Sequence, residues 1–201
     1  MKTRAIGVFG AALFVLGACG NNEVLLTGER LDLRGNETVE QVNRSAPLAL
    51  PAPSVNASWT HKNGNTEHSL HHPALKRSLR QAWATPIGEG NERKHRITAD
   101  PVVATGRIYT MDSRSLVSAH ATSGGTVWTR DLTPPSESKD DASSGGLAIA
   151  GDTLYVTSGF GFVTALDAAT GTPRWTQDLD AAASGAPTVQ DGIVYLTTRV
   201  A

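Results

Sequence analysis

The sequence repeats itself with a period of about 46 residues, and this repeat limits the folds open to the chain more than any other feature. Residues 107–132 align with residues 153–179. Four positions match at an offset of 46 and four at an offset of 47, namely Ile108/Leu154, Tyr109/Tyr155, Val117/Val163 and Ala119/Ala165, then Gly124/Gly171, Trp128/Trp175, Asp131/Asp178 and Leu132/Leu179. One inserted turn residue explains the change in offset. Trp83, which lies 45 residues before Trp128, and residues 192–196 extend the pattern in both directions.

Each repeat unit is predicted to contain four short strands. Twenty Gly and ten Pro among 201 residues favour short strands joined by turns over long helices. In the second unit we expect four strands, near residues 146–150, 153–157, 162–167 and 174–178. Repeats of about 40–45 residues with four strands are typical of β-propeller blades. The sequence therefore predicts an all-β fold, a β-propeller of four-stranded blades.

Only the first two to three blades of such a propeller fit into this chain. Within a propeller domain at residues 54–201 we expect blades near 101–132 and 145–179 and the start of another at 187–201. Six to eight blades would need roughly 240–360 residues. We therefore expect the chain to be a fragment or the product of an early-terminated reading frame.

A short motif in the second unit resembles the tryptophan-docking motif of pyrroloquinoline-quinone-type propeller repeats. Residues 165–171 have the sequence Ala-Leu-Asp-Ala-Ala-Thr-Gly, and Trp175 follows four residues later. The side-chain oxygens of Asp167 and Thr170 can cap the turn, and Gly171 accepts a positive φ. We expect this turn to deliver Trp175 to the seam between two blades.

The first unit carries Trp128 at the equivalent position but departs from the motif upstream. His120-Ala121 stands where the second unit has Leu166-Asp167-Ala168, so the side-chain cap is weaker there. The alternative interpretation is that these tryptophans are ordinary core residues of a β-sandwich.

The amino terminus has the features of a lipoprotein export signal. Lys2 and Arg4 precede an apolar run at residues 5–16, and about 12 apolar residues are too few to span a bilayer. The run closes with Leu16, Gly17, Ala18 and Cys19, which resemble a bacterial lipobox. The resemblance implies a signal peptide at residues 1–18 and lipid attachment, palmitate included, at Cys19. An ordinary secretory signal with a chance cysteine is the alternative.

Between this signal and the repeats, residues 19–53 are predicted to form a flexible tether. They are polar, contain no aromatic residue, and include Pro47, Pro51 and Pro53. No Asp follows Cys19 directly, which by resemblance to enterobacterial sorting favours the outer membrane. The formal charge of −1 is spread along the chain, so nucleic acid is an unfavourable partner.

The lipobox, the polar tether and the docking-motif blades together resemble the family of the outer-membrane protein assembly factor BamB. The segments that carry this resemblance are residues 28–34, residues 96–103 and the motif at residues 165–175. The resemblance implies a non-enzymatic scaffold without a cofactor, anchored in the outer membrane and facing the periplasm. Its expected partners are subunits of the β-barrel assembly machinery and nascent outer-membrane proteins, which an exposed blade edge could bind by β-augmentation.

Two other functions remain open at this stage. Quinoprotein dehydrogenases use the same repeat to hold pyrroloquinoline quinone with calcium, and they resemble one another in a vicinal cysteine pair, which a chain with one cysteine cannot form. A periplasmic binding module with a different partner is the third possibility. We nominate no catalytic residue.

Two polar clusters are interpreted as loops rather than metal sites. His61, His68, His71 and His72 fall within 12 residues and could hold zinc or copper if they converged, but turn-forming residues lie among them. Asp140 and Asp141 lack the alternating spacing of a calcium loop. We therefore predict no metal site.

Overall fold

The computed structural model describes residue 47 and residues 49–142 and 145–199. The chain divides into two units, residues 1–47 and residues 48–201, and every strand described below lies in the second. The described residues form strands, turns and bends but no α-helix. In this part of the chain no helix has the length and apolar character that crossing a membrane requires.

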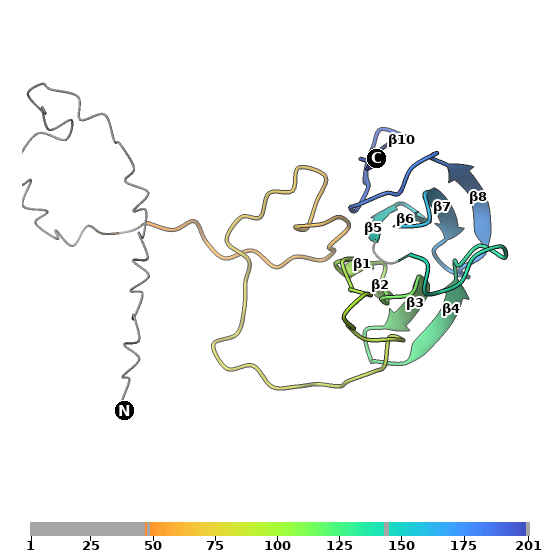
Figure 1. Ribbon diagram of the computed structural model, residues 1–201. Helices are drawn as coiled ribbons and strands as arrows, with labels where there is room; N and C mark the ends of the chain where they lie inside the picture. The colour runs from red at the N-terminus through yellow and green to blue at the C-terminus, as the bar shows by residue number, and fades with distance from the viewer. Residues whose placement is uncertain (1–46, 48, 143–144, 200–201) are drawn as a thin grey trace, which may run out of the picture. The chain divides into compact units, whose positions relative to one another are not determined.

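Ten strands form two four-stranded sheets and one two-stranded sheet (Figure 1). The first sheet consists of β1 (Val102–Ala104), β2 (Arg107–Met111), β3 (Leu116–Ala121) and β4 (Thr126–Asp131). The second consists of β5 (Gly145–Ala150), β6 (Thr153–Ser158), β7 (Phe162–Asp167) and β8 (Pro173–Asp178). The third pairs β9 (Thr188–Gln190) with β10 (Ile193–Tyr195). All neighbouring strands are antiparallel and follow chain order, so the predicted all-β fold of four-stranded blades is confirmed.

The two complete sheets share a local irregularity in the pairing of their last two strands. The pairing of β3 with β4 shifts register between Ala119 and His120. The pairing of β7 with β8 shifts between Ala165 and Leu166, the equivalent position one repeat later. An extra residue at such a point increases the local twist of the outer strands. The repeat seen in the sequence is therefore a repeat of backbone geometry.

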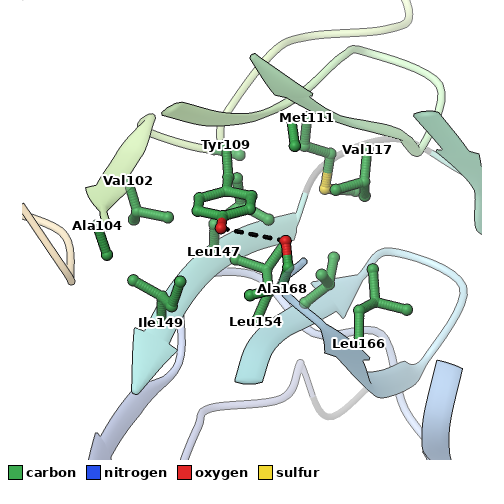
Figure 2. Close-up of a cluster of buried hydrophobic side chains, with 13 residues drawn as sticks. Val102, Ala104, Tyr109, Met111, Val117, Leu147, Ile149, Leu154, Leu166 and Ala168 are labelled. Carbon is green, nitrogen blue, oxygen red and sulfur yellow. Dashed lines mark hydrogen bonds between the residues drawn. The ribbon is translucent and has the colours of Figure 1, made fainter. Parts of the chain in front are cut away.

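The hydrophobic core lies between the first two sheets (Figure 2). The first sheet contributes Val102, Tyr109, Met111 and Val117, and the second contributes Leu147, Ile149, Leu154 and Leu166. Tyr109 has no exposed surface, and its hydroxyl donates to the carbonyl of Ala168 at 3.2 Å, drawn as the dashed line in Figure 2. Burying each large aliphatic side chain contributes about 1.5–3 kcal/mol. The blades are held together mainly by this shared core.

The first strands of successive sheets lie next to one another. β1 contacts β5, and β5 contacts β9. At Gly146 in β5 an added Cβ would come within 2.2 Å of the Cα of Ala186, just before β9. The backbone approaches this closely only because the residue has no side chain. The first strands of propeller blades surround the central channel, so this close approach lies near the axis.

None of the ten strands lies within residues 54–100. These residues contact the sheets through isolated bridges and single side chains, including an antiparallel bridge between Trp59 and Val103 of β1. Ser54 pairs with Pro73 within the segment itself. This stretch of the predicted propeller domain is therefore irregular chain that packs against the blades.

Candidate functional site

The docking turn of the second blade is held by its own side chains. Asp167 Oδ1 accepts hydrogen bonds from the backbone N–H groups of Ala169 and Thr170 and from the Thr170 hydroxyl, each at 3.0 Å. Thr170 Oγ1 accepts from the N–H of Thr172 at 3.3 Å. Gly171 has a φ of 71°, which a residue with a side chain adopts only at a cost of about 1–2 kcal/mol. The turn is rigid because these local bonds fix its backbone.

This turn receives a tryptophan from the preceding blade. Trp128 of β4 donates its indole N–H to the carbonyl of Ala168 at 3.1 Å. A Cβ placed on Gly171 would lie 2.6 Å from the Trp128 ring, so the ring rests directly on the glycine. Arg130 Nε donates to the Gly171 carbonyl at 2.9 Å. The seam between the blades is thus fixed by Trp128 as well as by the core.

The delivery of Trp175 to a seam between blades stays a prediction. Trp175 lies on β8, is 43% exposed, and has its ring 6.0 Å from that of Tyr155. The tryptophan that packs on this turn in the structure is Trp128, which comes from the preceding blade. The motif therefore joins the turn of one blade to the tryptophan of the blade before it.

The same arrangement occurs one blade earlier, although the motif is incomplete there. Trp83 donates its indole N–H to the carbonyl of Thr122 at 2.8 Å. A Cβ on Gly124, whose φ is 96°, would lie 2.9 Å from the Trp83 ring. The turn closes through the N–H of Gly124, which donates to the Ala121 carbonyl at 2.9 Å. A glycine at this position is sufficient for docking without the aspartate cap.

An arginine that sequence reasoning missed connects the docking turn to the neighbouring hairpin. Arg174 Nη2 lies 2.8 Å from Asp152 Oδ2 and 2.7 Å from Asp167 Oδ2. Hydrogen bonds from Arg174 lower the pKa of Asp152 to about 2 and also lower the pKa of Asp167. Arg174 and Asp152 are exposed and Asp167 is half-buried, and ion pairs contribute little to stability at such sites, so we assign Arg174 a role in orienting the turn.

Three consecutive residues, here called the central segment (59–61), bond to the first strand of each sheet in turn. Trp59 exchanges two backbone hydrogen bonds of 2.7 Å with Val103 of β1. The carbonyl of Thr60 accepts from Ile149 of β5 at 2.9 Å. His61 Nε2 accepts from the N–H of Val189 of β9 at 3.0 Å. The chain's own residues therefore satisfy backbone groups at the centre of three blades.

The histidines of the predicted polar loop lie in separate contacts. His61 is 2% exposed, and its ring centre lies 6.4 Å from that of His68. His68 bonds to the Lys62 carbonyl at 2.6 Å and to the Thr188 hydroxyl at 2.8 Å. His72 Nδ1 lies 2.6 Å from the Pro51 carbonyl. No group of three or more His, Cys, Asp or Glu residues in the described part of the chain is arranged to hold a metal ion.

The two loop aspartates are engaged in protein contacts. Asp140 Oδ1 lies 2.7 Å from Arg114 Nη1, and Asp141 Oδ2 accepts from the N–H of Ser138 at 2.7 Å. The predicted lipobox residues Leu16, Gly17 and Ala18 and the predicted lipidation site Cys19 lie outside the described residues.

The bond between Val189 and His61 predicts a loss of stability in acid. Burial, with a contribution from neighbouring His68, lowers the pKa of His61. A lowered pKa in the folded state means that protons bind the unfolded chain more tightly, so stability is complete above the unfolded value of about 6.5 and falls as the pH drops below it. Protonated Nε2 cannot accept from Val189, which costs about 1–2 kcal/mol. Urea unfolding at about pH 7.5 and about pH 5 should show this loss.

The variant His61→Gln should lose less stability than the wild type over the same pH range, since its amide does not titrate. His71→Gln is the matched control, because His71 is exposed and forms no hydrogen bond with the described residues. Burial also lowers the pKa of His120, but both variants retain that residue. Equal pH dependence of the two variants would contradict the role of His61.

Solved structures show which fold the chain shares. Over 70% of this chain, the quinohemoprotein alcohol dehydrogenase from Comamonas testosteroni is 27% identical with a TM-score of 0.55, and the match covers 23% of that enzyme. A quinohemoprotein alcohol dehydrogenase from Pseudomonas putida is 24% identical over 70% of this chain and 22% of its own, with a TM-score of 0.56. The chain thus spans less than a quarter of these relatives and shares their β-propeller fold.

A family model matches part of the sequence. Residues 113–200 match the model of the family described as outer membrane protein assembly factor BamB. BamB from Moraxella catarrhalis is 22% identical over 54% of this chain and 36% of its own, with a TM-score of 0.43. No curated protein matches the chain.

Proposed function

We propose that this chain is part of a non-enzymatic scaffold of the β-barrel assembly machinery, which aids the assembly and insertion of outer-membrane proteins. The observation that carries the proposal is the match of residues 113–200 to the BamB family. In this proposal Cys19 carries the lipid anchor in the outer membrane, and the blades face the periplasm. The partners are subunits of the machinery and nascent outer-membrane proteins.

The outer strand β8 supports a route by which such a scaffold binds extended chains. All six of its residues are exposed, and it is the edge strand of its sheet. An open edge can add a strand through main-chain hydrogen bonds, with little regard to the sequence that binds. A photo-crosslinker at Gln177 should capture client chains; its failure while the machinery still copurifies would contradict this route.

A quinoprotein dehydrogenase is the second candidate, favoured by the similarity to the alcohol dehydrogenase from Comamonas testosteroni. A ligand in a propeller's central channel would lie against the first strands of the blades. There the central segment already bonds to β1, β5 and β9. Buried polar side-chain atoms without a partner belong to residues outside these strands, namely His95, Arg114, Ser115 and Thr133. The presence of the chain's own residues at this position supports the scaffold over the enzyme.

Affinity purification of the full-length tagged protein from outer membranes, followed by mass spectrometry, separates the two functions. The scaffold proposal predicts that subunits of the assembly machinery copurify, and that Cys19→Ser, which removes the only cysteine, reduces their recovery. Recovery of bound quinone without any of those subunits would overturn the proposal in favour of the enzyme.

A further inference from the structure

One segment of the second unit carries positive charge that nothing in the described structure balances. Between Glu67 and Glu89 the sequence contains no acidic residue. Lys76, Arg77 and Arg80 lie in this interval, are exposed, and form no ion pair or hydrogen bond with the described residues. By contrast, Arg114, Lys139 and Arg174 each pair with a carboxylate. We call residues 74–83 the basic strap.

The basic strap also exposes large apolar side chains. Leu75 is 76% exposed and Leu79 is 69% exposed, although both are among the most hydrophobic residue types. Single exposed leucines are ordinary, but here two of them alternate with three unpaired cations over six residues. The combination of apolar and cationic side chains on one short segment indicates a binding surface.

The two ends of the strap are held by contacts, whereas its middle forms no hydrogen bond or ion pair with the described residues. Ala74 donates to the Ser54 carbonyl at 2.6 Å, and Trp83 is docked on the turn at Gly124. Residues 75–82 form no hydrogen bond with other described residues and contain neither helix nor strand. In Figure 1 this part of the chain, in yellow, runs as a wide loop away from the sheets. The middle of the strap can therefore change conformation without disturbing the blades.

Its sequence is amphipathic at helical spacing. Leu75, Leu79 and Ala82 stand at positions i, i+4 and i+7, which lie on one face of a helix. The three cations fall on the remaining faces. An apolar face beside Lys and Arg, without acidic residues, is the pattern of helices that lie in the interface of a membrane with anionic lipids.

We propose that the basic strap docks on an anionic lipid surface, with Leu75 and Leu79 entering the interface and Lys76, Arg77 and Arg80 contacting headgroups. A lipid surface is a better partner than a protein groove, because the strap has no regular structure that a groove could complement. Binding to a membrane requires only cationic side chains and apolar side chains that can enter the interface. The inference is independent of the proposed scaffold role, since it rests on residues outside those matched to the family.

A fluorescent reporter on the strap tests the proposal. The full chain carrying Cys19→Ser and Ser78→Cys has a single thiol for an environment-sensitive dye. Vesicles of phosphatidylcholine with phosphatidylglycerol should shift the emission to the blue, and pure phosphatidylcholine vesicles should not. Added salt should weaken the response, because it screens exposed charges. Lys76→Glu/Arg77→Glu/Arg80→Glu should lower the affinity for these vesicles at least on the order of a hundredfold, since each cation contributes roughly fivefold and each Glu adds repulsion.

The matched control reverses the same number of charges elsewhere. Lys62, Arg93 and Arg96 are exposed cations outside the strap, and changing all three to Glu should leave the dye response within about twofold of the wild type. An equal loss in both triple variants would overturn the proposal, as would a shift with neutral vesicles alone. Absence of any vesicle response, with a shift on adding subunits of the assembly machinery, would overturn it in favour of a protein partner.

Discussion

Replacing Trp128 with alanine should lower the free energy of unfolding by about 3 kcal/mol, whereas the same change at Trp175 should cost about 1 kcal/mol or less. The two residues occupy equivalent positions in successive repeats. Trp128 packs on Gly171 and donates to the Ala168 carbonyl, and its ring centre lies 6.0 Å from that of Tyr109. Trp175 is 43% exposed on β8. Removing Trp175 therefore loses less buried apolar area than removing Trp128.

Urea unfolding of the two variants and the wild-type chain, followed by circular dichroism, measures this difference. Trp175→Ala is the matched control, because it removes the same side chain from the same strand position of the next blade. Equal destabilisation by the two substitutions would show that the docking contact contributes nothing beyond an ordinary exposed tryptophan.

Adding a single methyl group at Gly146 should destabilise the protein by about 3 kcal/mol, the upper end of the usual cost of overpacking. The Cβ of Gly146→Ala would lie 2.2 Å from the Cα and 2.4 Å from the N of Ala186. These are backbone atoms of the chain entering β9, so they cannot move aside as a side chain would. The first strands of the second and third sheets would have to separate.

Gly125→Ala is the control for this effect. A Cβ on Gly125 would meet nothing within 4 Å, and Gly125 is not among the glycines with positive φ. We expect this variant to match the wild type within about 0.5 kcal/mol in the same urea experiment. If Gly146→Ala were as stable as Gly125→Ala, the result would contradict the close packing of β5 against the third sheet.

The strands could be predicted from the sequence because their signals are local. The four strands expected in the second unit differ from β5, β6, β7 and β8 by no more than one residue at either end. Turn-forming Gly and Asp residues set these boundaries, and the repeat of apolar positions set the number of strands. The all-β fold with four-stranded blades followed from the same observations.

The partners across the molecule could not be predicted in the same way. The motif places the docking turn and Trp175 close together in sequence, but nothing in it indicates that the turn contacts Trp128, about 40 residues earlier. The contact of His61 with Val189 spans 128 residues. Neither contact has a local sequence signal. The spacing of residues within one blade carries no information about which residues of another blade they contact.

The sequence alone determined what depends on neighbouring residues: the repeat, the turns, the strands and the glycines that those turns require. Only the tertiary structure decided which tryptophan fills which turn, where the central segment lies, and that Lys76, Arg77 and Arg80 have no partner within the described residues. The physical reason is that turn and strand geometry is set by backbone sterics over a few residues. Packing between blades, and the pairing of charges, depend on which distant surfaces meet.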